Sequence, residues 1–288
     1  MRSSVDATFE TSLVDIYPEG AVPRVTVNGL GMHYEQLGSG PPLVLITGIP
    51  GTAANWLPFA ERLKNDFTIT VFDNRGSGFT DKPEDYYSIK QMAADAAGLI
   101  EQLRLGPSNV FGISMGGMIA QELAINHRQL VRRLVLGCTQ CGGSQVIPPG
   151  EEVNQAFAFP DDDWGARMRL LGPLAFSATT RRERPDFIEA FVTLKTAEPQ
   201  PLYAYRRQIG ACVRHDTYER LDRIACPTLV VTGTDDDVIL AANSETLHRR
   251  IPGSSLRYLP GAGHLFFLEQ PEATAALLKE FLFQASQC

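Results

Sequence analysis

Residues 109–121 read NVFGISMGGMIAQ, and this stretch decides the fold. Strand-like residues run into Ser114, and helix-like residues follow at once. Gly112 stands two positions before the serine and Gly116 two positions after it, which is the G-x-S-x-G pattern of a sharp strand-to-helix turn. Such a turn strains the serine backbone and lifts its side chain into the open, where larger neighbours would collide. We therefore predict that Ser114 is a nucleophile.

Strand-like and helical patterns alternate along most of the chain. The run LVLITG (43–48) suits a strand that is buried on both faces of a sheet. Apolar residues recur every three or four positions over 89–103, as in an amphipathic helix. Residues 24–38 are typical of a hairpin with a turn at Asn28-Gly29. The predicted fold class is α/β, with a mostly parallel central sheet flanked by helices.

The alternation breaks between residues 140 and 225, an interval rich in proline, arginine and aspartate. It looks helical and irregular, and we interpret it as a cap inserted between two strands. The predicted organisation is an N-terminal arm (1–21), a first core part (22–139), the cap (140–225) and a second core part (226–288). Phe157, Trp164 and Phe176 are the cap residues expected to bind substrate. The alternative for these aromatic side chains is that they pack the cap onto the core.

Composition excludes several classes of protein. The chain has 288 residues, 44% of them hydrophobic, and a net charge of −7, which argues against a nucleic-acid-binding face. No apolar run reaches the roughly 18 residues of a membrane span, and the N-terminus shows no apolar signal-peptide region. We expect a cytoplasmic protein with no nucleic-acid or membrane partner, and a homodimer is the default oligomer.

The cysteines predict neither a disulfide framework nor a metal site. Their number, five, is odd and they are dispersed, which favours reduced thiols. Cys138 and Cys141 form a CxxC, for which a redox pair is the alternative to two small residues after a buried strand. No second pair stands at zinc-site spacing, and His264 with Glu269 is not a ligand spacing, so we expect no metal.

The stretch FDNRGSGFTDKP (72–83) does not indicate a dinucleotide cofactor. Its Gly76-Ser77-Gly78 lacks the third glycine of G-x-G-x-x-G, because position 81 is aspartate. We interpret Asp73, Arg75 and Gly76 as a structural turn and expect no cofactor.

In combination, these motifs resemble the α/β-hydrolase fold family. The resemblance covers the chain from about residue 22 to the C-terminus and rests on LITGIPG, FDNRGSGFTDKP, GISMGGM, TGTDDD and GAGH, all in family order. It implies a serine nucleophile followed along the chain by an acid and then a histidine.

His264, in LPGAGHLFFLEQP, is the expected base, because it follows the last strand and is flanked by Gly261 and Gly263. The remaining histidines are read as structural or surface residues: His33, His127, His215 and His248. The acid is expected at Asp236, the third residue after Gly233, with Asp235 as runner-up. Some relatives carry an acid at the end of the strand before the cap, but that place reads Gly137-Cys138-Thr139 and holds no carboxylate.

The resemblance places the oxyanion hole at two backbone amides, those of Met115 and Ile49. Many relatives have His-Gly in this loop, whereas this chain has Thr47-Gly48. The Thr47 hydroxyl is a possible substitute for the histidine side chain.

These residues predict a serine hydrolase that cleaves a carboxylic ester or lactone of a small, fairly apolar substrate through an acyl-enzyme on Ser114. The motifs resemble those of enol-lactonases and methylesterases. A thioesterase, a C–C hydrolase and a cofactor-free oxygenase are alternatives within catalysis. A non-hydrolytic ligand-binding protein, or one of cyclase or lyase type, is the alternative of another class. Dehalogenase and epoxide-hydrolase chemistry need aspartate where this chain has Ser114.

Overall fold

The computed structural model describes residues 22–160 and 162–284. The arm expected over 1–21 lies outside the described residues, and so does Cys288. No helix of the described ranges has both the length and the apolar character that crossing a membrane requires.

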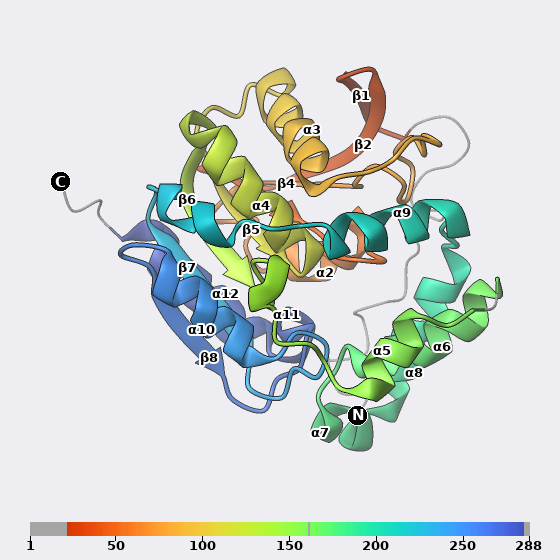
Figure 1. Cartoon of the computed structure of the whole chain (residues 1–288). Coiled ribbons are helices and arrows are strands. Elements are labelled where there is room, and N and C mark those ends of the chain that lie inside the picture. Colours follow the sequence, from red (N-terminus) through yellow and green to blue (C-terminus); the bar gives the residue numbers. More distant parts are fainter. Residues whose placement is uncertain (1–21, 161, 285–288) are drawn as a thin grey trace.

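A central sheet of eight strands organises the chain (Figure 1), in the order β1-β2-β4-β3-β5-β6-β7-β8. The pairs β1·β2 and β2·β4 are antiparallel. All other neighbouring strands in this order are parallel. The mostly parallel α/β fold predicted from the sequence is therefore confirmed. The strands are β1 (Arg24–Val27), β2 (Leu30–Leu37), β3 (Pro42–Ile46), β4 (Thr68–Phe72), β5 (Ser108–Ile113), β6 (Val131–Gly137), β7 (Thr228–Gly233) and β8 (Ser255–Leu259).

The predicted N-terminal hairpin is present as β1 and β2. Asn28 and Gly29 both have positive φ, at 53° and 77°, which is the backbone of a tight two-residue hairpin turn.

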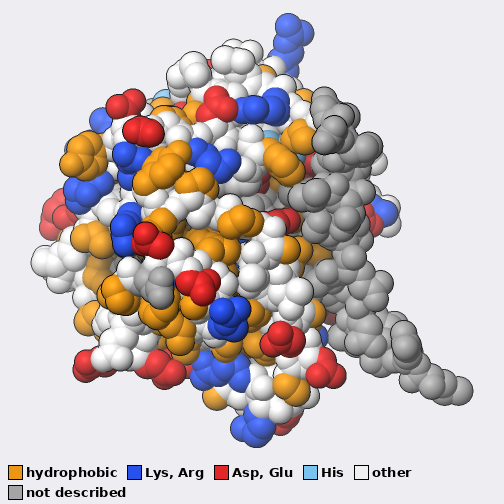
Figure 2. Space-filling view, turned by 90° about the vertical axis from the view of Figure 1, so that its right-hand side faces the viewer, with side chains coloured by type: hydrophobic (Ala, Val, Ile, Leu, Met, Phe, Trp, Pro, Cys, Tyr) orange, Lys and Arg blue, Asp and Glu red, His pale blue; other side chains and the backbone are white. Residues whose placement is uncertain are grey.

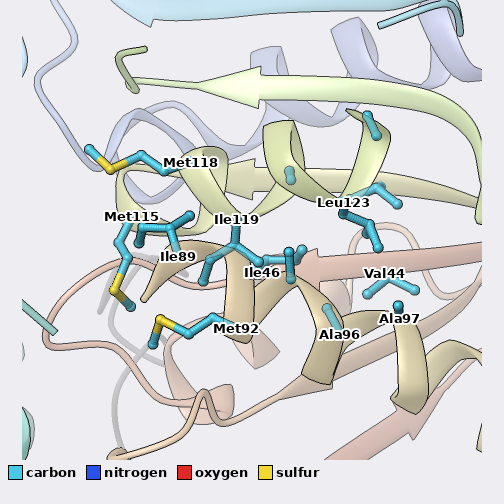
Figure 3. Close-up of a cluster of buried hydrophobic side chains, with 14 of the residues drawn as sticks. Val44, Ile46, Ile89, Met92, Ala96, Ala97, Met115, Met118, Ile119 and Leu123 are labelled. Carbon is cyan, nitrogen blue, oxygen red and sulfur yellow. The ribbon is translucent and has the colours of Figure 1, made fainter. Parts of the chain in front are cut away.

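Each face of the sheet carries its own apolar core, because successive strand residues point to opposite faces. Val44 and Ile46 of β3 pack with helices α3 (Ile89–Gln102) and α4 (Met115–Asn126), as Figure 3 shows. Leu43 and Leu45 of the same strand pack on the opposite face. The elements there include α2 (Leu57–Ala60), α11 (Phe266–Glu269) and α12 (Pro271–Phe283). Helix α10 (Ala241–Arg250) lies between β7 and β8 in the chain.

Five helices fall between β6 and β7, in the interval read as a cap. They are α5 (Glu151–Phe157), α6 (Trp164–Leu174), α7 (Ala178–Glu183), α8 (Pro185–Ala197) and α9 (Leu202–Val213). In Figure 1, α5 to α8 gather beside the sheet rather than within its helical layers. Short 3-10 turns complete the described chain: Ala53–Asn55, Arg128–Leu130, Gly143–Gln145 and Tyr218–Arg223. The interval is helical as expected, while the residue boundaries of the cap stay a prediction.

Positive and negative side chains are interspersed on the face drawn in Figure 2, with no broad field of one sign. This pattern agrees with the acidic net charge of −7. An electrostatic footprint for nucleic acid would be a basic patch or stripe.

Candidate active site

Ser114 occupies a strained turn between β5 and α4. Its backbone lies at φ 54° and ψ −124°, a conformation that residues with a side chain rarely adopt. The N–H groups of Gly117 and Met118 donate to the Ser114 carbonyl, so the helix starts at the serine itself. The strain predicted from GISMG is therefore present, and Ser114 lies at the amino end of α4, where backbone N–H groups favour negative charge.

The glycines around Ser114 are explained by contacts between backbones. A Cβ on Gly112 would lie 2.2 Å from the carbonyl oxygen of Gly116, and one on Gly116 would lie 2.1 Å from that of Ile46. Both distances are far below van der Waals contact, and backbone atoms cannot swing away. The turn therefore needs glycine at both positions if α4 is to pack against β3 and β5.

Asp236 lies buried in the loop after β7, where backbone amides fix its carboxylate. Its Oδ1 accepts hydrogen bonds from Val238 N–H (2.8 Å) and Ile239 N–H (2.9 Å). Its Oδ2 lies 2.9 Å from Nδ1 of His264. Asp235, the runner-up, is exposed and accepts from the Thr234 hydroxyl. The geometry thus brings Asp236, and not Asp235, to the histidine.

His264 follows β8 and is itself buried. Burial alone would lower the pKa of its imidazole. The negative charge of Asp236 and its hydrogen bond outweigh burial and hold the pKa of His264 well above its ordinary value. A carboxylate on Nδ1 also fixes the tautomer, leaving Nε2 to accept a proton.

A second carboxylate, Glu269 of α11, holds the His264 loop against the cap. Glu269 accepts hydrogen bonds from the backbone N–H of Gly263 and, at 2.8 Å, from that of Ser177. The N–H of Leu265 donates to the Ala175 carbonyl at 2.9 Å. Core and cap therefore share one hydrogen-bonded junction immediately beside the imidazole.

His33 forms another buried imidazole–carboxylate pair but has no free ring nitrogen. Its Nδ1 lies 2.8 Å from Asp73 Oδ2, and its Nε2 lies 2.8 Å from Glu35 Oε1. With both nitrogens engaged, His33 cannot serve as a base, and its reading as a structural residue agrees with this geometry. Asp73 also accepts from Ala53 N–H at 2.7 Å, so the turn at 73–76 supports the loop after β3.

The loop after β3 brings backbone amides toward Ser114. A Cβ on Gly48 would lie 2.8 Å from Ser114 Cβ, so this loop passes directly over the serine. Ile49 and Met115 both line the cavity that contains Ser114. Within the described chain, neither of their N–H groups donates a hydrogen bond. Two unused amides beside a serine are what an oxyanion hole requires.

Thr47 stands where many relatives have histidine, and two hydrogen bonds define its surroundings. Its hydroxyl donates to the Gly48 carbonyl at 3.2 Å, and its own carbonyl accepts from the Asn74 side chain at 3.0 Å. A Cβ on Gly51 would lie 1.7 Å from the Thr47 hydroxyl oxygen. The hydroxyl and a bare glycine therefore shape the loop in this chain.

Ser114 and His264 face one cavity of about 300 Å³, within the size range of small-molecule sites. No hydrogen bond joins Ser114 Oγ to the imidazole among the described residues; such bonds commonly tighten only when substrate binds. Apolar side chains dominate the lining, among them Met118, Phe157, Met168, Leu171, Val238 and Phe267.

The expectation for the cap aromatics needs correction. Phe157 lines the cavity, but Trp164 and Phe176 do not. Phe176 is fully buried and packs edge-to-face against Phe187 and Phe191. Trp164 donates its ring N–H to the Lys195 carbonyl at 2.8 Å. The contacts of Trp164 and Phe176 named here lie within the cap, and Phe176 also shares an apolar cluster with Phe266 of the core, as the packing alternative had expected.

Cys138 lies against the His264–Asp236 pair, at the strand-end position where some relatives carry their acid. One ligand atom each from Cys138, Asp236 and His264 fall within 4.8 Å of one another, the only such metal-ligating group in the described chain. Burial raises the pKa of the Cys138 thiol. The three residues lie far apart in the chain, so their spacing does not predict this cluster. The four described cysteines are free thiols.

The family follows from comparison with known proteins. The model of the alpha/beta hydrolase family matches residues 43–277. The chain belongs to the alpha/beta hydrolase family. It is 28% identical over 247 residues to a poly(3-hydroxyalkanoate) depolymerase of Ectopseudomonas oleovorans, covering 85% of this chain and 86% of that protein.

Two solved structures of this family share the whole architecture. The enol-lactonase from Burkholderia xenovorans LB400 superposes with a TM-score of 0.81 at 26% identity, covering 91% of this chain and all of the other. Est816, described as an N-acyl homoserine lactone degrading enzyme, gives a TM-score of 0.77 at 29% identity, with 90% and 100% covered. This hydrolase is therefore similar over about nine tenths of its length to an enol-lactonase and to an N-acyl homoserine lactone degrading enzyme.

Sequence reasoning missed several residues that shape the site of this hydrolase. Asn74 was not singled out and Glu269 was considered only as a metal ligand, although both hold the loops of expected site residues. Cys138 could have been found, because it follows the strand end that was examined for an acid. No sequence pattern marked Lys195 as a cavity residue, because a lysine in the last turn of a helix usually lies at the surface and complements the helix dipole.

Proposed function

We propose that this hydrolase cleaves a carboxylic ester or lactone of a small, largely apolar substrate through an acyl-enzyme on Ser114. One observation carries the proposal. His264 is hydrogen-bonded through Nδ1 to the buried Asp236, and it faces the same cavity as the strained Ser114. A base oriented by a carboxylate and aimed at a nucleophile is the arrangement that acyl transfer uses.

The chemistry begins at the serine. Ser114 Oγ attacks the acyl carbonyl carbon, and His264 Nε2 takes the hydroxyl proton. Asp236 stabilises the imidazolium that forms and stays ionised itself. The carbonyl oxygen becomes negative and accepts hydrogen bonds from the Ile49 and Met115 amides, which donate to no other group among the described residues.

Collapse of this intermediate expels the alcohol, which receives its proton from His264. In a lactone the expelled alcohol stays attached to the acyl chain. Water then attacks the acyl-enzyme while His264 takes a proton from it, and the second collapse releases the acid and restores Ser114. Each proton passes through one imidazole, which is neutral when it acts as base and charged when it acts as acid.

The pocket explains why a small, apolar acyl group is proposed. Its volume of about 300 Å³ limits the substrate, and side chains such as Leu171 and Phe267 offer apolar contact. Burial of apolar substrate surface contributes about 25 cal/mol per Å².

A fluorophosphonate probe with peptide mass spectrometry tests the nucleophile. We expect labelling at Ser114 in the wild type and none in Ser114→Ala or His264→Ala. His248→Ala is the matched control, because His248 is exposed and bonds to Ser254. A panel of p-nitrophenyl esters and small lactones then measures turnover.

A folded protein that leaves Ser114 unlabelled and all panel members intact would contradict the proposal. A ligand-binding protein would then be favoured. Labelling of Ser114 without ester or lactone turnover would instead favour cleavage of a thioester or C–C bond.

A further inference from the structure

Three side chains with polar groups, those of Lys195, Asn55 and Trp56, line the cavity that contains Ser114. Lys195 comes from the last turn of α8, and Asn55 and Trp56 follow Ile49 by only six and seven positions. All three line the cavity, although only 3%, 8% and 0% of their surfaces are exposed. Deeply buried donors in an otherwise apolar pocket call for an explanation, because unpaired polar groups are costly to bury.

Several hydrogen-bond donors of these residues have no acceptor among the described residues, and the unpartnered oxygen of Glu198, Oε1, does not bond to them. Lys195 Nζ donates to Asn55 Oδ1 at 3.2 Å, its only hydrogen bond within the described ranges, although an ammonium carries three protons. Asn55 Oδ1 also accepts from Thr52 N–H, while Asn55 Nδ2 has no acceptor within residues 22–160 and 162–284. The indole N–H of Trp56 likewise has none in those ranges.

The charge on Lys195 is also incompletely neutralised. Burial lowers the pKa of the ammonium, while the negative charges of Glu198 and Asp73 oppose that effect. Neither carboxylate forms an ion pair with Lys195 among the described residues. Asp73 already accepts from Ala53 N–H, and Glu198 Oε2 accepts from the Thr52 hydroxyl at 3.2 Å.

We propose that Lys195, Asn55 and Trp56 form a subsite for a second carboxylate on the substrate, so that this hydrolase acts on esters or lactones of carboxy-substituted acids. The inference rests on the proposed function and deepens it. A carboxylate supplies two oxygens with about four acceptor positions, which matches the unused donors of the three residues. A dianionic phosphate would meet a single cation beside two carboxylates and is the poorer match.

The alternative is that Lys195 only anchors α8 to the core through Asn55. Both readings predict some loss of stability when Lys195 is replaced, so stability cannot separate them. Selectivity can, because an anchoring lysine affects charged and uncharged substrates alike, whereas a binding lysine affects the charged one.

The experiment compares kcat/KM for two matched esters, mono-p-nitrophenyl glutarate and p-nitrophenyl glutaramate, in which a neutral carboxamide replaces the carboxylate. The succinate and adipate pairs vary the distance between the two ends. The variants are Lys195→Met and Lys195→Gln, and Lys90→Met is the control, because Lys90 lies exposed on α3. Thermal unfolding and fluorophosphonate labelling report on folding.

We expect the wild type and Lys90→Met to prefer the carboxylate member of at least one pair by tenfold or more. Both Lys195 variants should lower that preference by about tenfold or more and so abolish it, since a buried charge pair loses one partner. A wild type that shows no preference in any pair, or Lys195 variants that keep it, would overturn the carboxylate subsite. Failure to cleave any ester, with Ser114 unlabelled, would overturn the proposed function instead.

Discussion

His264 Nδ1 lies 2.9 Å from Asp236 Oδ2, and both side chains are buried at the end of the parallel sheet. Two loops that follow different strands, β7 and β8, therefore meet at one hydrogen bond. A Cβ on Gly233 would lie 2.1 Å from the Ala262 carbonyl oxygen, so the loops are in backbone contact as well. This contact fixes the imidazole relative to the sheet edge, and its disruption is the most direct test of the site.

Replacing Asp236 by asparagine should lower kcat by about 10³- to 10⁴-fold with little change in KM, because the imidazole loses its tautomer control and charge stabilisation. Asp235→Asn is the matched control and should stay within about threefold of the wild type, since its exposed carboxylate bonds to Thr234. Steady-state kinetics with a p-nitrophenyl ester measures both. Equal losses in the two variants would mean that Asp236 is not the acid.

The pH profile of kcat/KM should show an acidic limb above pH 6.5. His264 must be neutral to take the serine proton, and Asp236 holds the pKa of His264 well above its ordinary 6.5. Activity is therefore lost as pH falls through that raised value. Asp236→Asn should move the limb to lower pH, because burial, which lowers the pKa, then has less opposition. The substrate should be an uncharged ester, so that Lys195 does not affect the profile. If the acidic limb does not move in Asp236→Asn, the assignment of Asp236 as the partner of His264 is contradicted.

The sequence identified candidate site residues that the structure brings together where those residues follow strand ends. Ser114 directly follows the buried strand β5, Asp236 lies three residues after the buried strand β7, and His264 follows β8 and two glycines, so the signal is local. A glycine there is demanded by backbone contacts, such as Gly116 against Ile46. Chain order then separates His264 from His33, which also has a carboxylate partner.

The cap could not be predicted in the same way. Phe176 packs with Phe187 and Phe191, and Lys195 meets Asn55 from 140 residues away in the chain. Helical periodicity shows which side of a helix is apolar, but not which other helix or cavity that side faces. The surroundings of the cap residues, including those proposed to select substrate, are therefore the part of the site that the sequence predicted least.

Removing the Glu269 carboxylate should loosen the His264 loop. Glu269→Ala leaves the N–H groups of Gly263 and Ser177 without their acceptor, so we expect kcat to fall by about 10- to 100-fold. Glu269→Gln retains one acceptor oxygen and should lose less. Glu272→Ala is the control, because Glu272 lies exposed on α12 and bonds to Arg62. Wild-type kcat in Glu269→Ala would show that the junction does not position the imidazole.

Stability should fall between pH 6.5 and pH 4 partly because of His215. Burial lowers the pKa of His215 to about 4 in the folded chain, against 6.5 for an exposed histidine. In that window the unfolded chain binds the extra proton, so unfolding becomes easier by up to about 1.4 kcal/mol per pH unit as pH falls. Urea unfolding of His215→Gln should therefore depend less steeply on pH than the wild type, whereas the exposed His248→Gln should match it. Parallel curves for His215→Gln and the wild type would contradict this role.

A carboxylate at position 138 should restore part of the function lost in Asp236→Asn. Ligand atoms of Cys138, Asp236 and His264 lie within 4.8 Å of one another, so an aspartate there reaches the imidazole from the end of β6. The backbone of residue 138 has φ 37°, which aspartate tolerates better than most residues. We expect the double variant Asp236→Asn with Cys138→Asp to recover about tenfold or more in kcat over Asp236→Asn alone. Cys138→Asn in the same background has the shape of Cys138→Asp but no charge, and it should give no recovery.

In the wild-type background, Cys138→Asp should instead reduce stability, because two buried carboxylates then compete for one imidazole. If Asp and Asn at position 138 behave alike, the end of β6 cannot supply the acid in this chain.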